Sequence, residues 1–108
     1  MKHLFTLRIL FLCIFAALGM RVSAEIIEYQ DGDLMYELNT ETLAAEIYDC
    51  NRSATEVIIP ESVTDINGVT YRVTSLGGWC FAYCYSLSSI SIPSSVTSLG
   101  QSCFFNCI

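Results

Sequence analysis

Four cysteines near the end of the sequence are the residues best placed, by type and spacing, to do chemistry. Their pattern is C-x3-C-x18-C-x3-C, close to the ligand spacing of a zinc ribbon, and its members are Cys80, Cys84, Cys103 and Cys107. The same spacing arises if the cysteines simply occupy equivalent positions of a 23-residue repeat. We therefore expect buried thiols and no metal or other cofactor, with disulfides and a metal site as alternatives.

Two aspartates, Asp31 and Asp33, flank a glycine and form the second candidate site. The pair could belong to a calcium-binding turn or act as the two carboxylates of a glycoside hydrolase. No further acidic residue follows closely enough to complete a calcium loop. We therefore favour a solvated hairpin turn.

The start of the chain, residues 1–24, has the organisation of a secretory signal peptide. Lys2 and Arg8 precede an apolar run over residues 9–18, and Val22-Ser23-Ala24 places small residues where a signal peptidase cleaves. The apolar run is about half of the ~20 residues that span a bilayer, which argues against a membrane anchor. We expect cleavage after Ala24, a secreted or cell-surface location, and no transmembrane span afterwards.

Removal of residues 1–24 leaves a strongly acidic chain. Arg52 and Arg72 remain against all eleven acidic residues, so the net charge is 2 − 11 = −9, and no lysine or histidine is left. Without a cationic surface, nucleic-acid binding is excluded as a function class. Without histidine and lysine there is no Ser-His or Cys-His dyad, no histidine-based zinc site and no Schiff base. We expect no enzyme, and a small carboxylate-based hydrolase is the minor alternative.

The last third of the chain repeats itself at a fixed 23-residue period. Residues 73–85 and 96–108 share eight of thirteen aligned positions, namely Val, Thr, Ser, Leu, Gly, Cys, Phe and Cys. Ser89-Ile90-Ser91-Ile92 alternates as a half-buried strand does, and Pro93 should end that strand. Gly77 and Gly100 mark corners at which φ could be positive, and each is followed by apolar residues near helical spacing.

One unit therefore consists of a strand, a turn, a short strand and a helical turn, and it must stack on its neighbours to bury its apolar face. The predicted fold is mainly β with short helical turns. Stacking would bring Cys84 and Cys107 roughly 5 Å apart at Cα, which is the geometry a disulfide needs. The predicted repeat core consists of Leu76, Cys80, Phe81, Cys84, Leu87, Ile90, Ile92, Val96, Leu99, Cys103, Phe104 and Cys107.

This pattern, Leu-x-x-Ile-x-Ile-Pro-x-Ser-Val-Thr-x-Leu-Gly-x-x-Cys-Phe-x-x-Cys, resembles the leucine-rich repeat of BspA-like bacterial surface proteins. Cys80 and Cys103 stand where that repeat usually has alanine. The resemblance covers residues 73–108 and is weaker over 34–72. It implies the start of a leucine-rich-repeat solenoid, secreted or surface-exposed, that serves adhesion or protein contact as part of a longer array.

Residues 25–72 are predicted to form a β-rich N-terminal cap, and residues 73–108 hold one complete and one truncated repeat. Asp31-Gly32 and Asn67-Gly68 predict hairpins, and residues 42–48 favour a strand over a helix. Residues 57–63 match 90–96 at an offset of 33, which is the period plus ten. The hairpin within residues 65–74 would contain this insertion.

The candidate binding face follows from strand alternation. If Ile90 and Ile92 point inward, Ser89 and Ser91 face outward, and Glu56 and Ile58 are their counterparts one layer earlier. Trp79, Tyr83 and Tyr85 cluster in one repeat, where packing between layers is the favoured interpretation and exposed contact anchors are the alternative. Trp79, at a variable repeat position, is the one of the three expected to face outward. The expected function is binding of a protein or other surface macromolecule through this face. The alternative is a structural cap and spacer with no binding of its own.

Overall fold

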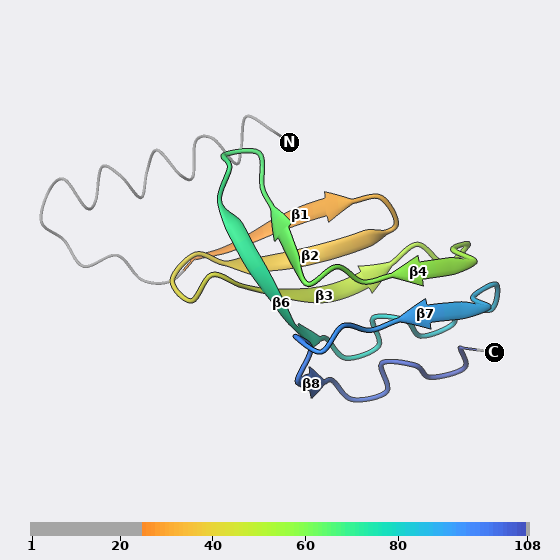
Figure 1. The fold of residues 1–108 in the computed structure, drawn as a ribbon. Coiled ribbons are helices and arrows are strands. Elements are labelled where there is room, and N and C mark those ends of the chain that lie inside the picture. The colour runs from red at the N-terminus through yellow and green to blue at the C-terminus, as the bar shows by residue number, and fades with distance from the viewer. Residues whose placement is uncertain (1–24, 108) are drawn as a thin grey trace, which may run out of the picture.

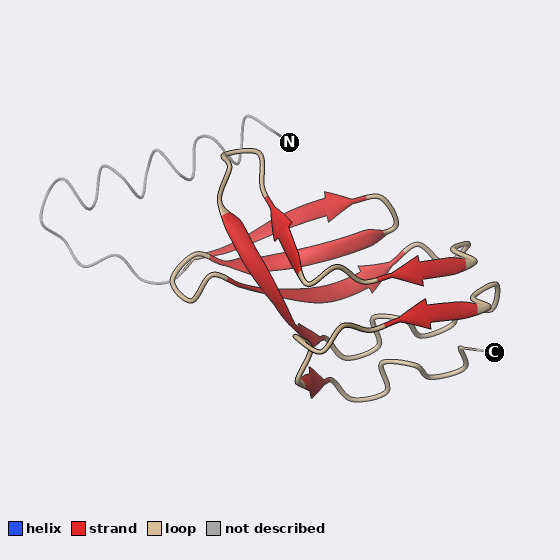
Figure 2. Ribbon diagram, viewed as in Figure 1, coloured by secondary structure: helices blue, strands red, loops and turns tan. Residues whose placement is uncertain are grey.

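The computed structural model describes residues 25–107, and the predicted signal peptide at 1–24 lies outside the described residues. The described chain consists of strands and turns and contains no helix (Figures 1 and 2). Consequently it has no helix long and apolar enough to cross a membrane. The fold is mainly β, as the sequence predicts.

Three antiparallel strands begin the fold: β1 (Ile26–Asp31), β2 (Leu34–Asn39) and β3 (Ala44–Cys50). The hairpin predicted at Asp31-Gly32 is confirmed, with Gly32 at a φ of 61°. The strand predicted for residues 42–48 is also confirmed as β3. Between β2 and β3 the side chain of Asn39 accepts hydrogen bonds from the next turn's backbone N–H groups, at 2.9 and 3.0 Å.

A second hairpin interrupts the repeat where the sequence predicts the ten-residue insertion. It joins β5 (Ser62–Thr64) to β6 (Thr70–Leu76) in antiparallel register. The Asp65 carboxylate accepts hydrogen bonds from the N–H groups of Asn67 and Val69, at 2.9 and 3.0 Å, and Gly68 has a φ of 82°. The Asn67-Gly68 hairpin is thus confirmed, and an aspartate that bonds its own turn fixes its shape.

Parallel pairing stacks the rest of the chain into coils. β4 (Glu56–Ile58) pairs with β7 (Ser89–Ser91), in the register that the match between segments 57–63 and 90–96 suggests. β6 pairs with both β3 and β8 (Ser98–Leu99). We number the coils by residues: coil 1 is 44–59, coil 2 is 73–92 and coil 3 is 96–107. Coil 1 thus belongs to the same two ladders as the repeats, although its sequence falls within the predicted cap.

The segments after Gly77 and Gly100 differ from the predicted helical turns. Trp79 and Tyr83 have φ values of 64° and 62°, and such left-handed residues interrupt a right-handed helix. Their N–H groups, and that of Phe81, donate to carbonyls of coil 3 instead, at distances of 2.8–3.1 Å. The chain therefore forms a series of single turns in which these N–H groups bond the neighbouring coil rather than their own.

Burial falls from the inner coils to the outer one. Six members of the predicted repeat core are buried, namely Leu76, Cys80, Phe81, Cys84, Leu87 and Cys103. Four more are half-buried, namely Ile90, Val96, Phe104 and Cys107. Two predicted core residues are instead exposed, Ile92 by 41% and Leu99 by 58%. The residues at the same positions one coil earlier, Ile59 and Leu76, are buried because the coils that carry Ile92 and Leu99 cover them. Ile92 and Leu99 have a described neighbour on one side only.

The corner glycines have a steric role that differs from the predicted one. Neither Gly77 nor Gly100 has a positive φ. A β-carbon at Gly100 would instead lie 2.5 Å from the carbonyl carbon of Gly77 and closer still to the amide nitrogen of Gly78. Glycine is therefore needed where the backbones of coils 2 and 3 touch.

The Gly100→Ala variant tests this contact. Because the clash is with backbone, which cannot rotate away, we expect the free energy of unfolding to fall by about 1–3 kcal/mol. Gly78→Ala is the matched control, since its β-carbon would come no closer than 3.2 Å to another atom, the carbonyl oxygen of Gln101. Thermal unfolding followed by circular dichroism measures both, and equal melting temperatures would contradict the contact.

Candidate binding surface

Four of the five predicted binding residues lie together on the outer face of the β4–β7 ladder. The register pairs Glu56 with Ser89 and Ile58 with Ser91, and all four side chains are exposed. Ile58 is 70% exposed, which is unusual for a large apolar residue on a strand. The fifth residue, Trp79, lies on the stack of turns and is separate from this ladder.

Trp79 belongs to a cluster of four exposed aromatic side chains. Its ring meets that of Phe105 edge-on at 5.2 Å, Phe105 meets Tyr83 at 5.8 Å, and Tyr83 meets Tyr85 at 6.1 Å. We call Trp79, Tyr83, Tyr85 and Phe105 the aromatic cluster. Each is between 43% and 65% exposed. The cluster spans coils 2 and 3, so it exists only when both coils are stacked.

Phe105 is the member that sequence reasoning missed. Its repeat counterpart is Ala82, which is 1% exposed because coil 3 covers it. The N–H of Tyr83 donates to the carbonyl of Phe105 at 2.9 Å, so the hydrogen bonds between the turns pair positions that are not exact repeat equivalents. The available signal in the sequence was a phenylalanine at the position where the preceding repeat has alanine.

A groove of about 330 Å³ separates the tip of the β1–β2 hairpin from β4. Three carboxylates line it, those of Asp31, Asp33 and Glu56. Its apolar wall consists of Leu34, Val57, Ile58 and Pro60, and Tyr36 also lines it. The structure therefore brings the Asp31–Asp33 turn together with two residues of the predicted binding face, a meeting for which the sequence carries no signal. We call this feature the acidic groove.

The three carboxylates of the acidic groove do not converge as metal ligands. Among residues 25–107, no group of three or more His, Cys, Asp or Glu side chains is arranged to hold a metal ion. The Asp33 carboxylate accepts a hydrogen bond from the Asn51 side-chain amide at 3.2 Å, which ties the hairpin tip to coil 1.

The five cysteines of residues 25–107 form two columns that run through the coils. The Cys50 thiol lies near Cys84, whose carbonyl in turn accepts a weak bond from the Cys107 thiol at 3.9 Å. The second column pairs Cys80 with Cys103. All five are free thiols in this structure.

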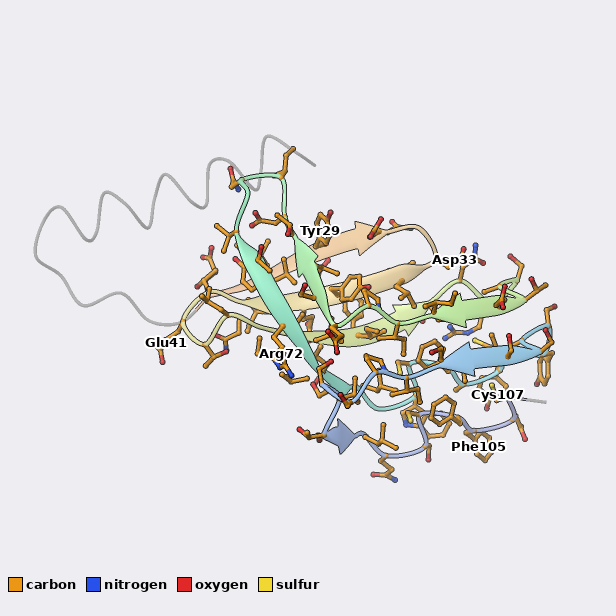
Figure 3. All side chains as sticks on the ribbon, in the orientation of Figure 1. Tyr29, Asp33, Glu41, Arg72, Phe105 and Cys107 are labelled. Atoms are coloured by element: carbon orange, nitrogen blue, oxygen red, sulfur yellow. The ribbon has the colours of Figure 1, made fainter. Side chains whose placement is uncertain are left out.

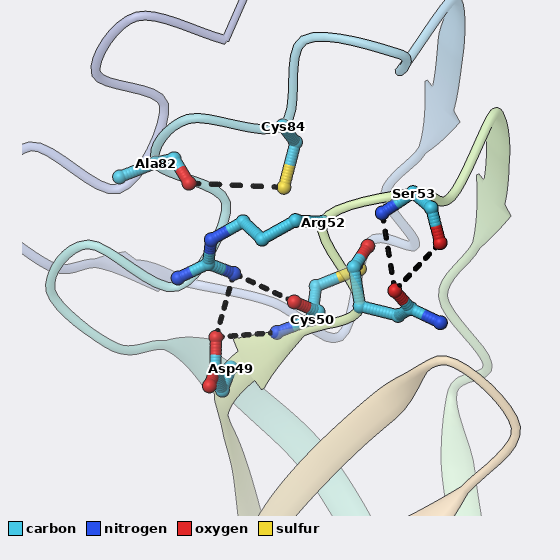
Figure 4. Close-up of polar contacts among 7 residues, drawn as sticks. Asp49, Cys50, Arg52, Ser53, Ala82 and Cys84 are labelled. Atoms are coloured by element: carbon cyan, nitrogen blue, oxygen red, sulfur yellow. Dashed lines mark hydrogen bonds and ion pairs between the residues drawn. The ribbon is translucent and has the colours of Figure 1, made fainter.

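An arginine borders the first column (Figure 4). Arg52 Nη1 donates to the Asp49 carboxylate at 2.7 Å and to the Cys50 carbonyl at 2.6 Å. Desolvation of the guanidinium opposes its charge, but Asp49 and Cys84 outweigh that effect and raise the pKa of Arg52. Burial is the largest cause that raises the pKa of the Cys50 thiol to about 12.

Comparison with known proteins identifies the repeat. The family model described as the BspA type leucine rich repeat region (6 copies) matches residues 41–108, more than half of the chain. The chain belongs to the BspA-type leucine-rich-repeat family. The match begins just before β3, so it includes all three coils.

Two crystal structures of bacterial leucine-rich-repeat proteins resemble this BspA-type chain. One, from Bacteroides capillosus, is 31% identical with a TM-score of 0.68 and covers 74% of this chain. The other, a leucine rich cell surface protein from Faecalibacterium prausnitzii, is 32% identical with a TM-score of 0.65 and covers 80%. The chain spans 59% of the first relative and 22% of the second. Among curated proteins, none matches it.

Cys80 allows a test of the buried thiols, because alanine usually stands at this position of the BspA-type pattern. Burial raises the pKa of the Cys80 thiol from 9.0 to about 12. The unfolded chain therefore loses this proton near pH 9 while the folded chain keeps it, so the stabilising effect is complete below pH 9 and is lost as the pH rises toward 12.

We expect the melting temperature to fall between pH 9 and pH 11, with each such thiol contributing at most about 1.4 kcal/mol per pH unit. The variant Cys80→Ala should show a shallower fall, because one titrating thiol is gone while the small buried volume is kept. Calorimetry across this pH range provides the comparison. Parallel curves for the two proteins would show that Cys80 ionises equally in both states.

Proposed function

We propose that this BspA-type chain is an exported scaffold that binds a protein or other surface macromolecule and does no catalysis. Residues 1–24 would be the leader, residues 25–72 the β-rich cap and residues 73–108 the repeats. The proposal rests on one observation, the aromatic cluster across coils 2 and 3, two of whose members, Trp79 and Tyr83, have left-handed backbone. The relative described as a cell surface protein supports a surface location.

The backbone under the cluster strengthens this interpretation. Trp79 and Tyr83 occupy left-handed positions whose coil 3 equivalents are Ser102 and Asn106, with φ values of 57° and 50°. Asparagine adopts this conformation readily, whereas a large aromatic residue does so at a cost of roughly 1–2 kcal/mol. Folding alone favours asparagine at such a site, so large exposed aromatics there indicate a contact role. Strained residues of this kind gather at functional sites.

Tryptophan and tyrosine are also the residues that most often dominate binding energy. A scattered exposed aromatic needs no explanation, but four in mutual contact form a patch that a partner can cover. The edge-on ring contacts fix the side chains before binding, which reduces the entropy lost on association.

A structural role as cap and spacer is the second candidate. The observation that favours it is the gradient of burial, in which each coil is covered by the next through backbone hydrogen bonds. In that case the exposed aromatics would contribute nothing and binding would belong to other repeats. A carboxylate hydrolase remains the least supported alternative.

The variant Trp79→Asn separates binding from folding. Asparagine suits the left-handed backbone, and its gain offsets the lost ring contact with Phe105, so we expect the melting temperature to change by only a few degrees. Binding of the purified protein to immobilised surface proteins and polysaccharides should fall at least tenfold, as for a central aromatic anchor.

Ile66→Ala is the matched control, since Ile66 is 57% exposed on the β5–β6 hairpin, away from the cluster. Trp79 is the sole tryptophan of the sequence, so its fluorescence reports directly on coverage of the cluster. A partner that binds Trp79→Asn as tightly as the wild type, without changing the tryptophan fluorescence of the wild type, would refute the role of the cluster and favour the spacer.

A further inference from the structure

The acidic groove has no cation of its own to balance its charge. Residues 25–107 contain two basic side chains, Arg52 and Arg72, and neither lines the groove. Arg52 is paired with Asp49. The negative potential of Asp31, Asp33 and Glu56 is therefore directed at the solvent within a concave surface, which concentrates cations there.

Tyr36 gives the acidic groove a nearly buried hydroxyl that no described residue engages by a side-chain hydrogen bond. The residue is 1% exposed and lines the groove. The charge of Asp31, which also lines the groove, acts on the Tyr36 hydroxyl, so the hydroxyl lies on the groove side of the residue. Burial raises the pKa of Tyr36, and Asp31 raises it further, so the hydroxyl stays protonated. Such a group can donate or accept, and it marks a place that a ligand can complete.

The shape of the groove selects among cations. A calcium ion needs six to eight oxygen atoms converging on one point, and the described carboxylates are not arranged in that way. Opposite them stands an apolar wall that includes Ile58, Val57 and Pro60. The volume of the acidic groove, about 330 Å³, is at the lower end of the range for ligand pockets, so the groove suits one long side chain.

We propose that the acidic groove binds the side chain of a lysine or arginine presented by a segment of a partner protein. The aliphatic stem packs on Ile58 and Pro60, since such stems cover apolar surface while the charged head stays polar. The charged head lies among Asp31, Asp33 and Glu56. The Tyr36 hydroxyl accepts a hydrogen bond from one N–H group of that head. This inference rests on the proposed function and deepens it by naming the chemistry that part of the partner must carry.

The test uses the blocked tripeptide acetyl-Ala-Lys-Ala-amide, its arginine analogue and a norleucine peptide of the same length. Titration into the isotope-labelled protein is followed by the NMR amide signals. We expect the lysine and arginine peptides to shift signals of Gly32, Asp33 and Ile58, and the norleucine peptide to leave them unchanged. The variants Asp31→Asn and Glu56→Gln should each weaken binding by about two- to fivefold, and less in high salt.

Glu41→Gln is the matched control, because it removes the same charge from an exposed carboxylate at the opposite end of the sheet from Asp33 (Figure 3). Equal weakening by Glu41→Gln would overturn the proposal, since only the net charge would then matter. Binding of the norleucine peptide as tight as that of the lysine peptide would overturn it too, as would the absence of groove shifts.

The variant Trp79→Asn should bind these peptides as the wild type does. If the wild type failed to bind the peptides at the groove but still bound a partner through the aromatic cluster, only this inference would be defeated. Loss of binding at the aromatic cluster with peptide binding intact would defeat only the proposed role of that cluster.

Discussion

Main-chain hydrogen bonds between coils are the interaction on which the rest of this structure depends. Coil 3 donates to coil 2 at the strands, with Thr97 bonding Thr74 at 2.9 Å, and coil 2 donates back along the turns. These bonds involve no side chain, so they hold for almost any sequence that keeps the register. Their one strict demand is steric, because Gly100 must lie against Gly77 and Gly78. Side chains outside the core are therefore free to vary.

That freedom explains how an aromatic cluster can sit on strained backbone. The backbone is left-handed at these two positions in both coil 2 and coil 3, whatever residues they carry, and in coil 2 the N–H groups of Trp79 and Tyr83 bond the neighbouring coil. In coil 3 the same two positions carry Ser102 and Asn106, and asparagine adopts this conformation readily. Coil 2 carries large rings at a cost that the bonds on both sides can sustain.

Local signals in the sequence were sufficient for the strands and hairpins. Asp31-Gly32, Asn67-Gly68 and the repeat period each act within a short stretch of chain, and the insertion before Thr74 followed from comparing two matching segments. The helical turns were mispredicted because apolar spacing resembles a helix, whereas the donors bond another coil. The exposure of Leu99 and the acidic groove depend on which segments meet, and no local pattern encodes that meeting.

The β5–β6 hairpin has a further consequence for how such a chain can change. It lengthens the path from coil 1 to coil 2, yet Val57 still faces Ile90 and Ala45 still faces Val73. β5 pairs only with residues 70–72 of β6, and β6 itself continues the ladder between β3 and β8, so the added chain is confined to β5 and the hairpin tip. The exposed tip of this hairpin, residues 66–69, is therefore a natural insertion point, where foreign loops could be grafted or lengths altered between relatives without changing the register of the stacked coils.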